Sequence, residues 1–157
     1  MIDLPMKAFC LMGSDGENKI EMTIDEIFGF PETTDYEGGY AFEGTLIIHV
    51  GCYKVHSKNY ISTTGVLCRF YDSLIKCYDS LEGIAKYTRM HDIALEFELV
   101  MTKNGHATID GKYIEYPHLS NKLTFEIETD QSCIRCAIDD LSRVESLFGD
   151  ANDKCIR

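Results

Sequence analysis

Apolar and polar side chains alternate along much of the chain, and this alternation predicts β-strands. The clearest case is residues 93–101, where apolar side chains at odd positions are separated by Glu96 and Glu98. A period of two is typical of a strand with one buried face. Asn104–Gly105 then follows, and this dipeptide is the strongest short signal for a hairpin turn. Further strands are expected over residues 19–27, 40–50, 52–61, 106–116 and 123–127.

Between residues 65 and 82 the apolar period changes to three and four, which predicts an amphipathic helix. Ser62–Thr64 offer side-chain hydroxyls that can cap its first turn. Gly83 stands where a left-handed residue commonly ends a helix. We therefore expect a first helix over about residues 65–82.

A second amphipathic helix is predicted over residues 131–148, between two possible caps, Thr129 and Asp130, and a terminating Gly149. Each helix has one apolar and one charged face, so each should lie against a sheet. The order is strands, helix, strands, helix. This order predicts an α+β fold in which a mainly antiparallel β-sheet carries the two helices.

The chain has 157 residues without a Pro/Gly/Ser-rich linker, so we expect a single domain over residues 1–157, with 150–157 as a frayed C-terminal tail. Seven cysteines cannot all pair within one chain. The N-terminal residues do not have the pattern of a signal peptide. Apolar runs are shorter than the roughly 18 residues that span a bilayer. These features predict a cytoplasmic protein.

Negative charge is concentrated near the N-terminus. The formal net charge is −11, and −8 of it falls between Asp15 and Glu43, where nine acids face one base, Lys19. This sign argues against a nucleic-acid partner and against an anionic membrane surface. The segment is either a solvated face that aids solubility or a negative field directed at a basic partner.

Tyr36-Glu37-Gly38-Gly39-Tyr40 lies inside this acidic segment and combines acids, aromatics and glycines. Tyrosines supply rigid apolar area in protein interfaces, and acids supply charge complementarity. The alternative is a loop whose tyrosines fold back onto the sheet. The candidate partner-binding residues are Asp25, Glu26, Glu32, Asp35, Tyr36 and Glu37.

Catalytic and metal-binding motifs are weak. Cys133 and Cys136 form a C-x-x-C at a predicted helix start, as in thiol-redox proteins, but no βαβ unit surrounds them and no second pair completes a zinc site. The pairs Glu96/Glu98 and Glu126/Glu128 each share one face of a strand, which is typical of the solvated side of a sheet. We therefore predict no enzyme activity, no metal and no cofactor.

Three stretches together resemble the WapI family of bacterial immunity proteins. They are Phe42-Glu43-Gly44-Thr45-Leu46, the stretch from Ser62 to Gly83 with its Phe70-Tyr71-Asp72-Ser73-Leu74, and Asn121 to Ser132 with its Thr129-Asp130-Gln131-Ser132. The resemblance covers about residues 20–148. It implies a cytosolic antidote that binds and blocks the C-terminal domain of a secreted toxin.

In the WapI case the toxin cleaves RNA, and an acidic inhibitor can occupy the basic groove of a nuclease. The resemblance thus implies a basic toxin domain as the partner, and it carries over no catalytic residues. Two alternatives stay open: a small thiol-redox or other enzyme that uses Cys133 and Cys136, and an oligomeric scaffold.

Overall fold

The structure, a computed structural model, describes residues 2–89 and 94–149. The expected tail at 150–157 and the predicted strand residue Ile93 lie outside these ranges. The elements are β1 (Met6–Met12), β2 (Lys19–Ile27), β3 (Ala41–Val50), β4 (Tyr53–Thr63), α1 (Thr64–Ser80), β5 (Ile84–Tyr87), β6 (Leu95–Met101), β7 (His106–Tyr116), β8 (Asn121–Asp130) and α2 (Gln131–Phe148).

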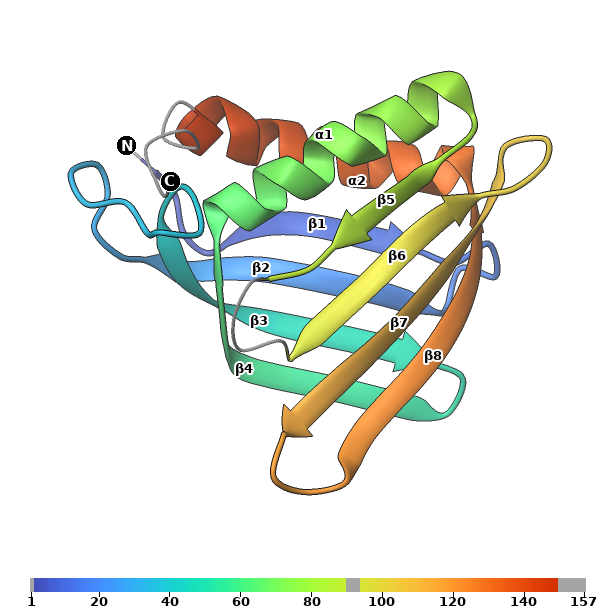
Figure 1. Ribbon diagram of the computed structural model, residues 1–157, viewed down its shortest axis with the longest axis horizontal. Helices are drawn as coiled ribbons and strands as arrows, with labels where there is room; N and C mark the ends of the chain where they lie inside the picture. The colour runs from blue at the N-terminus through green and yellow to red at the C-terminus, as the bar shows by residue number, and fades with distance from the viewer. Residues whose placement is uncertain (1, 90–93, 150–157) are drawn as a thin grey trace.

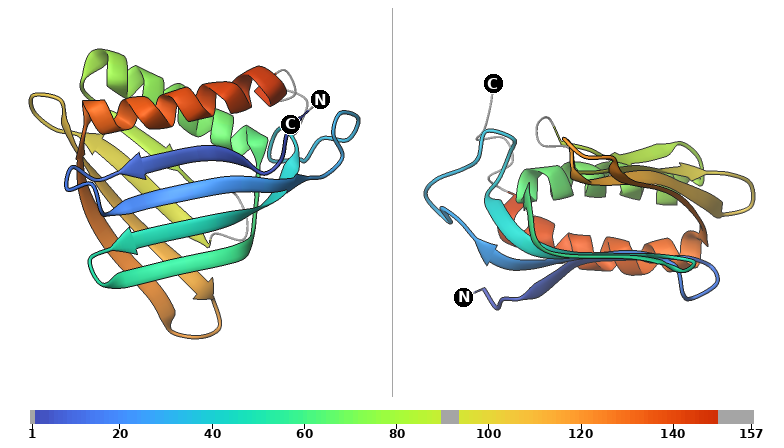
Figure 2. Two further views of the ribbon diagram at one scale, coloured as in Figure 1. Left: turned by 180° about the vertical axis from the view of Figure 1, so that it is seen from behind. Right: turned by 90° about the horizontal axis from the view of Figure 1, so that it is seen from below.

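The strands form two antiparallel four-stranded sheets, in the orders β1-β2-β3-β4 and β5-β6-β7-β8. The sheets face each other as two layers whose strands run obliquely (Figure 1; Figure 2, right). The predicted α+β class is confirmed. The strands before and after α1 belong to separate sheets, however, because α1 carries the chain from one layer to the other.

Each helix lies along the edge of the sheet that it does not follow in sequence. α1 comes after β4 but packs along β5, and α2 comes after β8 but packs along β1, with the two helices in contact (Figure 1). The helices therefore cover the outer edges of β1 and β5. Among the described residues, no helix packs along the opposite edges, at β4 and β8.

An aromatic cluster joins the two layers. Phe9 on β1, Phe70 on α1, and Tyr87 and Phe97 on the second sheet have ring centroids 5.3–6.4 Å apart. All four side chains are almost completely buried. Burial of aromatic side chains is a large hydrophobic contribution, so this cluster ties both sheets and α1 into one core.

The observed helix caps agree in part with those predicted. Thr63 caps α1 through its Oγ1, which accepts a hydrogen bond from the Val66 N–H at 3.2 Å. α1 ends at Ser80, and the left-handed residue at its end is Leu81 (φ 58°) rather than Gly83, which follows at φ 99°. Asp130 caps α2, whose span matches the predicted residues 131–148.

Candidate partner-binding surface

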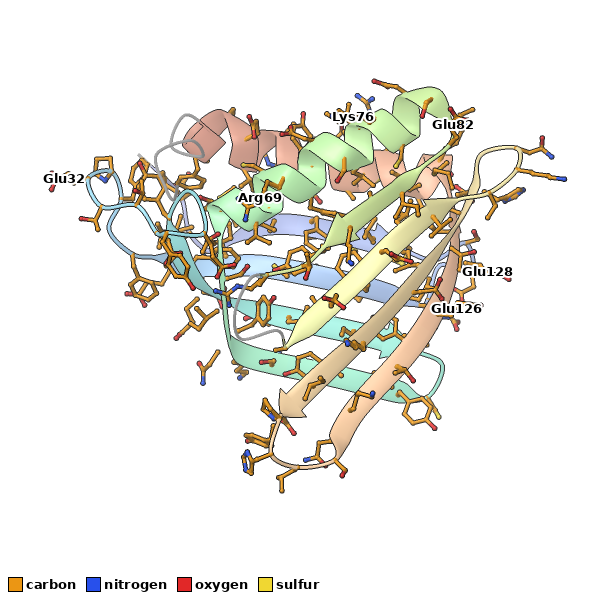
Figure 3. All side chains as sticks on the ribbon, viewed as in Figure 1. Glu32, Arg69, Lys76, Glu82, Glu126 and Glu128 are labelled. Carbon is orange, nitrogen blue, oxygen red and sulfur yellow. The ribbon has the colours of Figure 1, made fainter. Side chains whose placement is uncertain are left out.

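The segment between β2 and β3, residues 28–40, forms a loop at one end of the first sheet; we call it the 28–40 loop. It extends beyond the strands on the left of Figure 1, and Glu32 lies on it (Figure 3). Hydrogen bonds within the loop shape it into turns. The amides of Glu32 and Thr33 both donate to the Gly29 carbonyl, at 2.9 and 2.7 Å.

The base of the 28–40 loop is fastened to the first turn of α1. The Gly65 N–H donates to the Gly38 carbonyl at 3.0 Å, and the Thr64 N–H donates to the Tyr40 carbonyl at 2.9 Å. The Tyr40 N–H in return donates to Thr64 Oγ1 at 2.9 Å. The loop thus satisfies two of the amides that a helix N-terminus leaves without partners.

Glycine is required where these backbones meet. Gly38 and Gly39 have φ values of 112° and 66°, in the region that side chains rarely adopt. A Cβ on Gly65 would lie 2.3 Å from the Gly38 carbonyl carbon. The close approach therefore depends on missing side chains on both segments.

A buried ion pair forms a second anchor of the loop. Glu37 Oε1 accepts a hydrogen bond from Arg89 Nη2 at 2.6 Å, and the two side chains are only 1% and 9% exposed. Arg89 Nη1 donates to the Ile61 carbonyl of β4 at 2.7 Å. Burial opposes the charge of Arg89, but the hydrogen bond and charge of Glu37 outweigh it, so the pKa of the guanidinium is raised.

Aromatic and acidic side chains are exposed together at this end of the molecule. Phe28, Phe30 and Tyr36 are 43%, 42% and 51% exposed, and Glu26 and Glu32 are exposed beside them in sequence. Phe30 also packs edge-on against Tyr40, with centroids 5.0 Å apart, so its ring is held in place. Rigid aromatics with carboxylates around them suit a basic protein partner.

Three of the six predicted contact residues are exposed: Glu26, Glu32 and Tyr36. Asp25 and Asp35 are half-buried and already accept hydrogen bonds, from Thr45 Oγ1 at 2.7 Å and from the Glu37 N–H at 2.8 Å respectively.

Glu37, which was predicted to contact a partner, is the predicted site residue that lies deepest in the molecule. It lies in the interior and holds Arg89, because the turn around Gly38 and Gly39 directs the chain inward against α1. It positions the loop rather than presenting a carboxylate at the surface.

The acidic segment Asp15–Glu43 does not form one continuous patch. Asp15 and Glu17 lie in the β1–β2 turn, and β2 separates that turn from the 28–40 loop at the opposite end of the sheet (Figure 1). Glu21, midway along β2, pairs with Lys7 and Lys19 at 3.3 and 2.8 Å. The exposed acids Glu26 and Glu32, which lie near the exposed aromatic side chains, therefore belong to the adjoining end of β2 and to the 28–40 loop.

The outer face of the second sheet carries a row of like charges. Glu98, Asp110 and Glu126 occupy directly opposed positions on β6, β7 and β8. Glu96 is balanced by Lys112 at 3.8 Å, and Glu128 faces Thr108. Like charges directly opposite one another destabilise a sheet. The hydrogen bond and charge of Asp110 raise the pKa of Glu126.

We expect Glu126→Gln to raise the melting temperature at pH 7. A raised pKa in the folded state means that folding favours the protonated carboxyl, so this contribution to stability is present at low pH and is lost as the pH rises through that pKa. The gain over wild type should therefore shrink as the pH falls toward 4. Glu17→Gln, at an exposed position in the β1–β2 turn away from this row, is the matched control. An equal pH-independent gain in both variants would contradict the assignment.

Cys133 and Cys136 begin α2 as free thiols, one half-buried and one exposed. The N-terminus of α2 is already occupied by the Asp130 carboxylate, which accepts hydrogen bonds from the amides of Ser132 and Cys133 at 2.9 and 3.2 Å. The helix dipole that activates the first thiol of a redox motif is therefore compensated by a carboxylate.

Within residues 2–89 and 94–149 no group of three or more His, Cys, Asp or Glu side chains could hold a metal ion.

The model of the WapI-like immunity protein family matches residues 10–149, which is most of the chain. The chain belongs to this family. Comparisons with the curated proteins and with the solved structures found no significant match.

Membership supports a role as an immunity protein and implies a toxin protein as its partner. It also suggests a non-enzymatic role. Among the helices that the structure describes, neither has the length and apolar character needed to cross a membrane.

The sequence pattern did not indicate that Phe28 and Phe30 would be exposed at this surface or that Arg89 would anchor the 28–40 loop. Phe28-Gly29-Phe30-Pro31 places two aromatics next to a turn signal within the acidic segment, and this pattern could have indicated exposed aromatics. Arg89 has no local signal, since its partner Glu37 is 52 residues away in sequence.

Proposed function

We propose that this protein neutralises its cognate secreted toxin domain by binding it stoichiometrically through the 28–40 loop and the adjoining end of β2. The observation that supports the proposal best is the pre-shaped loop, which presents aromatics and carboxylates together on an anchored backbone. Pre-organisation raises affinity because less conformational freedom is lost on binding. A toxin with a basic surface, such as a nuclease, would be the complementary partner.

The mechanism that follows is occlusion. The net charge of −11 attracts a basic domain at long range, and Glu26 and Glu32 direct it to the loop. Phe28, Phe30 and Tyr36 then supply the apolar area that slows dissociation. A nuclease whose groove is covered in this way cannot admit its nucleic acid. No reacting group on this chain takes part, so inhibition needs one copy per toxin.

The role itself is tested with the C-terminal domain of a large secreted toxin encoded directly upstream of this gene. Purified together, the two proteins should form a 1:1 complex on a sizing column. Co-expression should restore growth to cells that produce the toxin domain. A toxin domain that neither binds nor loses its toxicity would contradict the proposal.

Reversing two exposed acids tests the site. We expect Glu26→Lys with Glu32→Lys to slow association with the toxin domain by about 10-fold at low salt, because electrostatic steering is lost. The rate should also become less sensitive to salt. Stopped-flow fluorescence at several ionic strengths measures both effects.

The matched control is Glu82→Lys with Glu128→Lys. Both residues are exposed and lie away from the 28–40 loop, and the change in net charge is the same (Figure 3). It should slow association far less. Equal association rates for the two double variants would show that the 28–40 loop is not part of the interface.

A further inference from the structure

A cleft of about 850 Å³ opens between β4 and the hairpin formed by β7 and β8. These strands lie on the side of the molecule away from the helices, toward the bottom of Figure 1. Neither helix fills the space between the sheets there. The cleft lies apart from the 28–40 loop in sequence, and the proposed binding of the loop does not use it.

The cleft is basic although the protein is acidic. Among the described residues that line it are three exposed cations, Lys54, Lys58 and Lys122, against a single acid, Glu115. Arg89 contributes a further cation, which Glu37 balances. In a chain with net charge −11, this concentration of positive charge marks a place for an anionic ligand.

Arg89 gives a second, independent sign of a ligand. Its side chain is 9% exposed and lines the cleft, and its Nε is buried without a hydrogen-bond partner among the described residues. Buried donors are nearly always satisfied, so a guanidinium that keeps one donor spare is a candidate for an added acceptor. Guanidinium groups bind carboxylates and phosphates particularly well.

The shape of the cleft favours a polypeptide. Within the described residues β4 pairs with β3 alone, so its other edge has backbone groups without a strand partner. An extended peptide can add to such an edge through main-chain hydrogen bonds. Tyr116 and Ile61, which are 48% and 44% exposed, provide apolar contacts at the rim. A nucleic acid would meet the same lysines but would gain nothing from the strand edge, and the acidic surface elsewhere would repel it.

We propose that this cleft receives an extended acidic segment of the toxin domain, which adds to the edge of β4 while its carboxylates meet Lys54, Lys58 and Lys122. The inference rests on the proposed function and extends it to a second contact of opposite sign. Arg89 adjoins both contacts, since it binds Glu37 of the 28–40 loop and the carbonyl of Ile61 on β4. One partner can therefore cover both, with a basic surface on the loop and an acidic segment in the cleft.

The first test is a triple charge reversal, Lys54→Glu, Lys58→Glu and Lys122→Glu. The three side chains are exposed, so the fold should be retained. We expect affinity for the toxin domain to fall about 100-fold, because like charges then face each other across the interface. The control is Arg69→Glu with Lys76→Glu and Lys103→Glu, three exposed cations outside the cleft that give the same change in net charge. Equal affinities for the two triple variants would overturn the proposal.

The second test needs no toxin and uses the wild-type protein. An isotope-labelled sample is titrated with a ten-residue peptide of alternating Glu and Val, with a Lys/Val peptide of the same design, and with a ten-nucleotide single-stranded RNA. The acidic peptide should shift the amide resonances of residues 54–61, and the triple reversal should abolish the shift. Stronger binding of the RNA, or no binding of the acidic peptide, would overturn the proposal.

The two tests separate this proposal from the proposed function. Loss of binding in the loop variants with unchanged binding in the cleft variant would overturn the cleft assignment and support the immunity role. A toxin domain that does not bind the wild-type protein would count against the proposed function, and the peptide titration would still decide whether the cleft takes an acidic strand.

Discussion

Replacement of Glu37 by glutamine, or of Arg89 by methionine, is expected to destabilise the folded protein by about 3–5 kcal/mol. Each change removes one member of an almost fully buried ion pair, whose atoms are 2.6 Å apart, and leaves the charge of the other member in the interior. The penalty comes from the remaining charge rather than from the lost attraction. Chemical denaturation monitored by circular dichroism measures it.

Two controls make this result specific. Lys112→Met breaks a partly exposed pair, with Lys112 Nζ 3.8 Å from Glu96 Oε1, and should cost less than about 1 kcal/mol. The double variant Glu37→Leu with Arg89→Met removes both buried charges and should recover much of the loss. A cost below about 1 kcal/mol for Glu37→Gln would show that the pair is not desolvated as the structure has it.

Gly65→Ala is expected to lower the free energy of unfolding by about 1–3 kcal/mol through overpacking. Alanine in a helix is ordinarily better than glycine by about 1 kcal/mol, so local propensity predicts the opposite sign. The new methyl group would lie 2.3–2.5 Å from backbone atoms of Gly38, and either the helix or the loop must move. Thermal and chemical denaturation measure the change.

The same substitution should weaken toxin binding, because it displaces the 28–40 loop from the first turn of α1. Asp72→Ala, at an exposed position on α1, is the control and should leave binding unchanged and stability equal or slightly higher. A stabilised Gly65→Ala variant would contradict the close approach that anchors the loop.

The helices and most strands could be predicted because their signals are local. Asp130 and Gly149 delimit α2 through capping chemistry that involves only neighbouring residues. β1 was not predicted, since an irregularity between Lys7 and Phe9 places Ala8 and Phe9 both in the core and removes the alternation. β5 was not predicted because it has only four residues.

The candidate site was harder to predict because it depends on contacts between segments that are distant in sequence. Glu26 and Glu32 could be expected at the surface, since isolated carboxylates avoid the interior. The burial of Glu37 depends on Arg89, and the cleft depends on β4 meeting β7 and β8, which are distant in sequence. The count of charge along the chain also placed the β1–β2 turn and the 28–40 loop in one acidic segment, although the two lie at opposite ends of the first sheet. Contacts between distant segments decide these features, and no local pattern encodes them.

Because each helix packs along the sheet that it does not follow in sequence, unfolding of one sheet should affect the other. The first 63 residues make a sheet whose β1 edge is covered only when α2 arrives at the end of the chain, and β5 is covered by a helix that precedes it. Phe9 and Phe70 likewise complete their packing only against Tyr87 and Phe97. Neither half can bury its own apolar face, so the halves should gain and lose their structure together, in a single cooperative transition.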